Sequence, residues 1–164
     1  MLIECLPIDI VERIVVLTET NRDYETNCSM IERLKEPQRR ERIIEAITKR
    51  EVDKEGTVRY LLDGKLHREN DKPAYESVSG TKQWYHDGKF HRENDKPAVE
   101  WSDGSKSWWY NGQRHRENDK PAFEWAHGMK EWWYNGQLHR ENGKPAVEGV
   151  DGMKEWWVNG KRIK

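Results

Sequence analysis

The spacing of apolar residues changes near residue 55 of this chain of 164 residues. Before that point, apolar residues recur at helical spacing in "LPIDIVERIVVL", in "YETNCSMIERL" and, after Pro37, in "PQRRERIIEAITKR". The pattern predicts three short helices within residues 1–54, the third with a basic last turn and with Ile43, Ile44 and Ile47 on its apolar face. A helical module of this size is marginal alone, so we expect it to cap the structure that follows.

After residue 55, the chain repeats with a period of 24 residues: "HRENDKPA" begins at His67, His91 and His115, and "HRENGKPA" begins at His139. Each unit holds two stretches rich in aromatic and β-branched residues, such as "AVEW" and "KSWWY", separated by "SDG" and closed by "NG". Asn-Gly and Asp-Gly pairs supply the positive φ angles of tight hairpin turns. The chain is therefore predicted to be mainly β, with a single-layer antiparallel β-hairpin repeat of about nine or ten short strands over residues 55–164.

Alternation of side chains along a strand sorts the aromatic residues onto two faces. The first stretch of each unit has one polar and one apolar face, since Glu100 alternates with Val99. In the second stretch, the first ring of each unit is expected in an inner stack, ring on ring from unit to unit: Trp84, Trp108, Trp132 and Trp156. The second ring points the other way and is the candidate partner-binding surface, because aromatic residues favour protein interfaces: Tyr85, Trp109, Trp133 and Trp157.

The charge balance limits the partners that the chain can bind. Charged residues make up 36% of the sequence, but the formal net charge is −1 and neither part of the chain is basic, which argues against nucleic acid. No run of about 18 apolar residues could span a membrane, and charges interrupt the first apolar stretch, so no export signal is expected. Two cysteines, Cys5 and Cys28, make no disulfide framework. We therefore expect an intracellular protein of the cytosol or nucleus.

The repeated histidines suggest metal ligands or catalytic bases. With two strands per unit, equivalent histidines would lie roughly 10 Å apart, too far to share one ion. A group that recurs in every unit is better explained by a contact of the histidine or arginine with a carboxylate of the same or the next unit, such as Glu69, Glu93, Glu117 or Glu141. We therefore expect no catalytic residue, no cofactor and no metal site.

The order W-x-x-N-G-x-x-H, followed by an extended stretch and D-G, resembles the MORN repeat (membrane occupation and recognition nexus) over residues 56–164. The "HR" and "PA" pairs are similar to a variant that is abundant in large DNA viruses of amoebae. The resemblance implies β-hairpins joined into an elongated, curved sheet, in a viral protein of the host cell or virion. Where the commoner pattern has "HGxG", this chain has "HRENDKPA", so membrane lipid ranks below a protein as the expected partner.

The segment "LPIDIVERI" resembles the start of an F-box, LP-x-[DE]-[IL]-x-x-x-[IL]. The resemblance implies that the helices bind the adaptor subunit of a ubiquitin ligase through Leu6, Pro7, Ile10 and Ile14, while the repeats select the protein to be modified. The following "NCSMIERLKE" is more polar than a usual second F-box helix and has no tryptophan. A plain capping bundle is the alternative.

Two classes of function follow from these features. In the first, a non-enzymatic interaction or scaffold protein binds a protein partner with its repeat sheet. In the second, a structural, self-assembling protein, associated with a membrane or virion, joins copies through its sheet edges and aromatic face. An enzyme is disfavoured, because no nucleophile with its base, phosphate-binding glycine loop or paired acid–base site stands outside the repeat positions.

Overall fold

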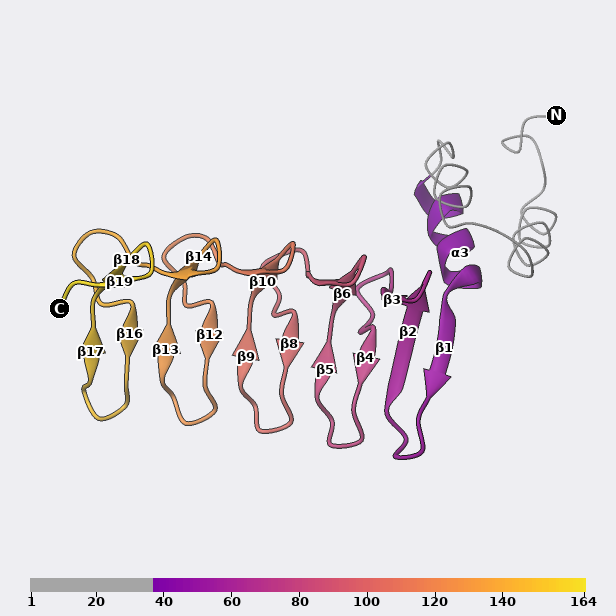
Figure 1. Cartoon of the computed structure of the whole chain (residues 1–164), viewed down its shortest axis with the longest axis horizontal. Coiled ribbons are helices and arrows are strands. Elements are labelled where there is room, and N and C mark those ends of the chain that lie inside the picture. The colour runs from indigo at the N-terminus through magenta and orange to yellow at the C-terminus, as the bar shows by residue number, and fades with distance from the viewer. Residues whose placement is uncertain (1–36) are drawn as a thin grey trace.

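A computed structural model of the protein describes residues 37–164. The helices expected in "LPIDIVERIVVL" and "YETNCSMIERL" lie outside these residues. The third expected helix is present as α3 (Pro37–Ile47), at one end of an elongated array of strands (Figure 1). Its predicted apolar face is buried: Ile43, Ile44 and Ile47.

The remaining elements of residues 37–164 are strands, and eleven of them form one long antiparallel sheet, the main sheet (Figure 1). Ten of these lie side by side in chain order, while β3 pairs only with the end of β2. The predicted meander is confirmed. The strands of the main sheet are β1 (Lys49–Val52), β2 (Val58–Leu62), β3 (Lys65–Leu66), β4 (Tyr75–Glu76), β5 (Lys82–Gln83), β8 (Val99–Glu100), β9 (Lys106–Ser107), β12 (Phe123–Glu124), β13 (Lys130–Glu131), β16 (Val147–Glu148) and β17 (Lys154–Glu155).

Four two-stranded hairpins, the hairpin row, lie across the ends of the main-sheet strands (Figure 1). The backbone links neighbouring hairpins, since the Gly112 N–H donates to the Phe90 oxygen of the preceding hairpin at 2.9 Å. The sequence pattern did not predict this second row. Its strands are β6 (Tyr85–His86), β7 (Lys89–Phe90), β10 (Trp109–Tyr110), β11 (Gln113–Arg114), β14 (Trp133–Tyr134), β15 (Gln137–Leu138), β18 (Trp157–Val158) and β19 (Lys161–Arg162).

The hairpin row arises because four stretches of the "KSWWY" type each form two strands, where the sequence predicted one. In the first unit the corresponding residues form the single strand β2, as predicted. In the central unit, β9 ends at Ser107 and β10 begins at Trp109. The Trp108 N–H donates to the Ala122 oxygen at 2.8 Å, whereas the Trp108 oxygen accepts from the His115 N–H at 3.1 Å. The two hydrogen bonds of this residue thus lead to the main sheet and to the hairpin, and the chain bends between them.

The main sheet also begins earlier than the sequence predicts. Residues 49–52, assigned to the helical segment, form β1, which pairs with β2 over its whole length. The basic last helical turn is therefore wrong, because α3 ends at Ile47 and the basic Lys49 and Arg50 lie in a strand. Pairing with β2 satisfies the backbone groups of both strands and covers the outer edge of β2.

Residues with left-handed backbone angles set the turns. The hairpin row turns at Asp-Gly or Asn-Gly pairs with both φ angles positive, for example 48° at Asn111 and 82° at Gly112, as predicted. The repeated loops contain a second such pair, with φ of 60° at Asn94 and 55° at Asp95. Asn and Asp tolerate this conformation better than other residues with a side chain, which accounts for "ND" in the motif.

The register of the main sheet confirms the two different faces expected for the first stretch of each unit. Glu124 pairs with Lys106 and Lys130, while Phe123 pairs with Ser107 and Glu131. The charged face carries Glu76, Lys82, Glu100, Lys106, Glu124, Lys130, Glu148 and Lys154, and the aromatic face carries Tyr75, Gln83, Val99, Ser107, Phe123, Glu131, Val147 and Glu155.

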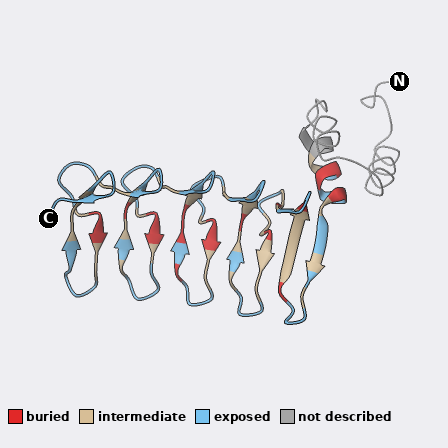
Figure 2. Cartoon of the chain, in the orientation of Figure 1, coloured by how far each residue is buried: buried red, intermediate tan, exposed pale blue. Residues whose placement is uncertain are grey.

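Most of the core of the array lies where the main sheet meets the hairpin row (Figure 2). Trp84, Trp108 and Trp132 are each 6% exposed, as predicted for an inner set, whereas Trp156 is half-buried. The alanine of each "PA" pair is fully buried beside them: Ala74, Ala98, Ala122 and Ala146.

An arginine, and not another ring, packs on each buried tryptophan. The Arg116 guanidinium carbon lies 3.7 Å from the centroid of the Trp108 ring, and the Trp108 indole N–H donates to the Asp95 backbone oxygen at 3.0 Å. Arg116 Nε in turn donates to Asp95 Oδ1 at 2.7 Å. The ring-on-ring stack expected for this set is therefore wrong. We call the arrangement the Asp–Trp–Arg clamp, and within residues 37–164 it occurs three times: Asp71–Trp84–Arg92, Asp95–Trp108–Arg116 and Asp119–Trp132–Arg140.

Each clamp joins two successive units. Asp95 lies in the loop that precedes the one holding Arg116, and Arg116 also donates to the Pro121 oxygen at 3.1 Å and to Glu124 Oε1 at 3.2 Å in its own unit. The Arg116 side chain is only 13% exposed, and two carboxylates compensate its charge. Charge-assisted hydrogen bonds are stronger than neutral ones, so the clamp couples each unit to the one before it.

Trp108→Ala should destabilise the protein by about 3–5 kcal/mol, as expected for deletion of a large buried aromatic side chain. Chemical denaturation followed by circular dichroism measures the loss. Trp125→Ala is the matched control, because Trp125 is 37% exposed against 6% for Trp108, and it should lower the free energy of unfolding by clearly less than Trp108→Ala does. Equal losses in the two variants would contradict the inner position of Trp108.

Acid should weaken the clamps. Hydrogen bonds from Arg116, and then from Lys120, lower the pKa of Asp95 from 3.8 to about 2. Because the folded pKa is the lower one, the stabilisation is present above about pH 4 and is lost as the pH falls towards 2. Asp95 is 42% exposed, so solvent screening limits its contribution to about 1 kcal/mol. Asp95→Asn should cost that amount at pH 6 and almost nothing at pH 2 in urea unfolding, and an equal cost at both pH values would contradict this account.

Candidate functional site

An aromatic strip lies in the middle of the aromatic face. The Phe123 ring centroid is 5.1 Å from that of Trp101 and 4.4 Å from that of Trp125, and His127 follows Trp125 at 5.7 Å. Phe123 is buried, whereas Trp125 is 37% exposed. These residues, Trp101, Phe123, Trp125 and His127, form the aromatic strip. It exposes an aromatic surface to solvent, and the buried Phe123 ring supports that surface from below.

Trp101 and Trp125 were not predicted as site residues. The signal lay in the differences between units, because the corresponding position holds Ser77, Trp101, Trp125 and Gly149 in turn. Residues that recur in every unit form turns and cover the core, as seen above. A position that changes from unit to unit is not required by the repeat and is available for a role of its own.

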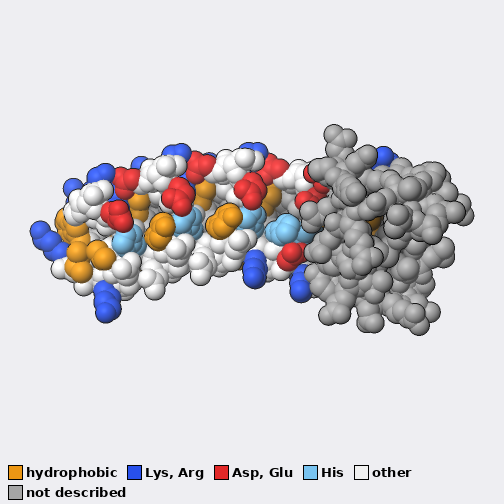
Figure 3. Space-filling model, turned by 90° about the horizontal axis from the view of Figure 1, so that it is seen from above, with side chains coloured by type: hydrophobic (Ala, Val, Ile, Leu, Met, Phe, Trp, Pro, Cys, Tyr) orange, Lys and Arg blue, Asp and Glu red, His pale blue; other side chains and the backbone are white. Residues whose placement is uncertain are grey.

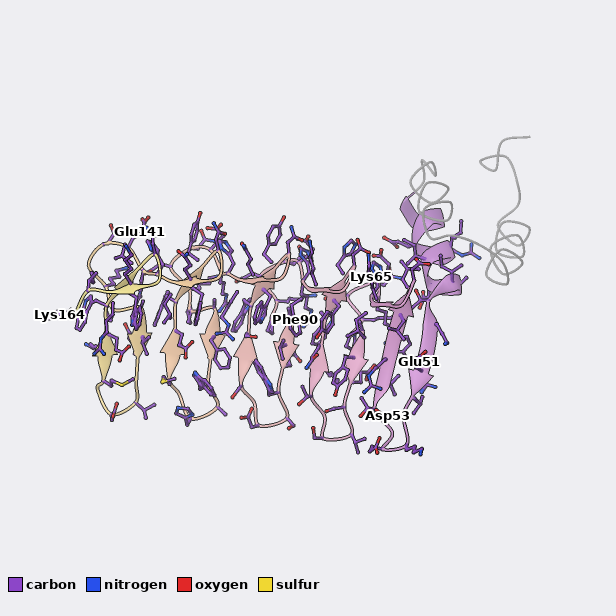
Figure 4. The ribbon with its side chains drawn as sticks, in the orientation of Figure 1. Glu51, Asp53, Lys65, Phe90, Glu141 and Lys164 are labelled. Carbon is purple, nitrogen blue, oxygen red and sulfur yellow. The ribbon has the colours of Figure 1, made fainter. Side chains whose placement is uncertain are left out.

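The second rings of the units, predicted to bind a partner, form a half-buried row between the two rows of strands. The Tyr85 ring stacks on Phe90 at 4.3 Å between centroids, and Phe90 contacts Trp109 at 5.0 Å. Arg114 lies between Trp109 and Trp133, at 5.0 and 4.6 Å from their centroids. We call this row the junction stack. Figure 4 shows Phe90 on the inner side of the hairpin row, toward the main sheet.

The polar atoms of the predicted partner-binding rings are all used inside the protein. Aromatic residues at interfaces commonly offer this polar group to a partner, so the junction stack can contribute mainly the exposed edges of its rings. The hydrogen bonds run from Tyr85 to Gln83 at 2.9 Å, from Trp109 to Ser107 at 2.6 Å, from Trp133 to Glu131 at 2.8 Å and from Trp157 to Glu155 at 2.9 Å.

Arg114 connects the junction stack to the aromatic strip. Its guanidinium carbon lies 4.8 Å from the Phe123 ring centroid, and its Nη1 lies 3.7 Å from Glu131 Oε2. Burial lowers the pKa of Arg114, and its buried Nε has no hydrogen-bond partner. A partly desolvated cation thus stands beside the aromatic strip.

The outer side of the hairpin row carries a line of histidines, which alternate with hydrophobic side chains beside a row of acidic ones (Figure 3). His91 and Tyr110 have ring centroids 4.9 Å apart, and His115 and Tyr134 repeat the contact at 4.8 Å. His91 Nε2 lies 2.9 Å from Glu93 Oε1, so the predicted histidine–carboxylate contact within one unit is confirmed.

Clefts of about 250, 190 and 350 Å³ separate successive loops on this outer side. The largest is lined by clamp residues, among them Asp119, Trp132 and Arg140, and by His139 and Glu141. Most of these polar groups already bond to one another. The clefts therefore follow from the repeat geometry and do not single out one unit as a site.

The expected adaptor-binding residues, Leu6, Pro7, Ile10 and Ile14, lie outside the described residues. Within residues 37–164, no helix combines the length and the apolar character needed to cross a bilayer.

Comparison with models of known protein families finds none that matches the chain. Comparison with curated proteins likewise finds none with significant sequence similarity.

Proposed function

We propose that the protein is a non-enzymatic interaction or scaffold protein whose repeat sheet binds a protein partner through the aromatic strip. The observation that carries this proposal is the exposed Trp125, which with Trp101 flanks the buried Phe123. Tryptophan, tyrosine and arginine are the side chains that contribute most to binding at protein interfaces. The strip brings two tryptophans together beside Arg114.

The strip is held rigidly, which favours binding. Trp125 Nε1 donates to Glu131 Oε1 at 3.1 Å, and Phe123 is fixed by strand pairing with Ser107 and Glu131 on either side. Little side-chain freedom is left to lose when a partner arrives, so the entropic cost of association is reduced. The surface suits a partner segment with an apolar anchor that packs against the tryptophans.

The charge pattern on the opposite face of the sheet favours a protein partner over nucleic acid as the ligand. Glu and Lys alternate from strand to strand, as at Lys106, Glu124 and Lys130, so the positive charges are not continuous. Binding to phosphate backbones depends on a basic stripe or patch. The charged face offers neither.

Photo-crosslinking in cells tests the proposal. A photoreactive phenylalanine analogue at position 125 should capture a discrete protein partner, and the same analogue at Lys106 on the charged face should not. Trp101→Ser with Trp125→Ser should then weaken binding of the captured protein by at least about 30-fold, which corresponds to about 2 kcal/mol for an interface anchor. The serine is the residue that the chain itself has at Ser77.

Two outcomes would contradict a partner-binding strip. One is capture of the same proteins from positions 125 and 106. The other is unchanged affinity in the serine variant while its thermal unfolding matches that of the unsubstituted protein.

Self-assembly is a second candidate, favoured by the edge of the sheet at β17. In the described part of the chain, β17 pairs only with β16. Exposed apolar side chains lie on or near this edge: Val150, Met153, Val158 and Ile163. An open strand edge with apolar neighbours recruits other edges. Sedimentation velocity should then show a concentration-dependent dimer that Met153→Lys removes, and a monomer at every concentration would exclude this second function.

The ligase-adaptor role and the MORN-like relationship remain proposals that rest on the sequence. In this proposal the N-terminal segment either caps the sheet or binds an adaptor subunit of a ubiquitin ligase. Co-purification of an adaptor with the unsubstituted protein, lost in Leu6→Ala with Pro7→Ala, would support the adaptor.

A further inference from the structure

Two histidines and one aspartate converge at the first hairpin of the hairpin row. His67 follows β3, His86 ends β6 and Asp87 begins the turn to β7. One ligand atom from each of the three lies within 4.8 Å of the others, and no other group of this kind occurs within residues 37–164. The convergence is independent of the aromatic strip and of the function proposed for it.

The distances are close to those of a metal site. His67 Nδ1 lies 3.2 Å from Asp87 Oδ1, and His86 Nδ1 lies 3.4 Å from Asp87 Oδ2. Two ligands of a tetrahedral zinc ion, each bonded at about 2.0–2.1 Å, lie roughly 3.3 Å apart. Small side-chain rotations would therefore bring all three ligands to bonding distance.

The hydrogen bonds of His67 fix its tautomer and direct Nδ1 toward Asp87. The Asp87 N–H donates to His67 Nδ1 at 3.1 Å, which leaves the ring proton on Nε2, where Glu69 Oε1 lies 3.2 Å away. A carboxylate on the far nitrogen of a metal-binding histidine is the usual outer contact of zinc sites. The single Nδ1 lone pair accepts the Asp87 N–H in the structure, so an ion held between Nδ1 and Asp87 Oδ1 would replace this hydrogen bond with a metal–nitrogen bond.

The exposure of the three side chains also suits a metal site. His67 is 2% exposed and therefore fixed, whereas His86 and Asp87 are about half exposed, at 47% and 50%, and give an ion access from solvent.

The other units place a histidine against a neighbouring residue in the same way, but they lack the metal-donor side chains that correspond to His86 and Asp87. His91 contacts Tyr110 at 4.9 Å between ring centroids, much as His67 contacts His86 at 4.7 Å, and the Asn111 N–H donates to His91 Nδ1 at 3.2 Å. The pair that corresponds to His86-Asp87 is Tyr110-Asn111, Tyr134-Asn135 or Val158-Asn159. Only the first hairpin has replaced a ring and an amide with an imidazole and a carboxylate.

We propose that His67, His86 and Asp87 bind one divalent transition-metal ion of the zinc class, with solvent in the fourth position. Two imidazoles and a carboxylate form a donor set suited to zinc. The ion would fasten the loop after β3 to the first hairpin, and it would stabilise the folded state by an amount that rises with the logarithm of the free ion concentration above the dissociation constant.

Titration calorimetry of the full chain with ZnCl₂ at neutral pH tests the site. The unsubstituted protein should bind one equivalent, and His86→Tyr with Asp87→Asn should weaken binding by more than about 100-fold, beyond the loss typical of outer-contact substitutions. This variant carries the Tyr-Asn pair of the next two units, so it should fold, and its circular dichroism should match. Absence of zinc binding, or equal binding by the variant, would overturn the proposal.

A gain-of-site variant gives a second, independent test. Tyr110→His with Asn111→Asp should build the same three donors around His91 and raise the stoichiometry from one to two. Cobalt(II) added in place of zinc should give d–d bands without a thiolate charge-transfer band, which separates this site from Cys5 and Cys28. A stoichiometry that stays at one, or a thiolate band in the unsubstituted protein, would contradict the assignment.

Discussion

An arginine that lies on a buried tryptophan is the contact on which the array depends. From β3 onward every strand is only two residues long, so backbone pairing alone holds each unit weakly. The clamp adds side-chain contacts between units to this weak backbone pairing. Arg116 covers the Trp108 ring and bonds to Glu124 in its own unit and to Asp95 in the unit before it. One side chain thus holds the bend at Trp108, strand β12 and the preceding unit together.

Part of this structure could be predicted from the sequence and part could not. The period of 24 and the Asn-Gly and Asp-Gly pairs predict the meander, because such pairs determine the local backbone. The bend at Trp108 depends on backbone hydrogen bonds to Ala122 and His115. The alternation of polar and apolar residues in the sequence does not predict these bonds. The burial of Arg116 was missed for a similar reason, since a guanidinium counts as exposed until its partners are known.

Within the array, constant and variable positions have different tasks. Constant residues such as Gly112 and Ala122 form the turns and the core. Variable ones place Trp101 and Trp125 on the aromatic face, and put His86 where the next unit has Tyr110. The candidate sites were therefore difficult to predict from what the units share. Comparison of the units with one another identifies them.

Near-identical units create a problem of register that the junction stack addresses. Arg140 and Arg116 stand in the same repeated motif, so a slipped chain could pair Arg140 with Asp95, expel one whole unit and still close a clamp. Loop entropy opposes this weakly, because doubling the length of a loop costs only about 0.6 kcal/mol. The junction stack differs from unit to unit, with Phe90, Arg114 and Leu138 at equivalent places. A slipped pairing would leave an unmatched charge or a gap in the junction stack. These variable side chains therefore favour the correct register of the units over a slipped one.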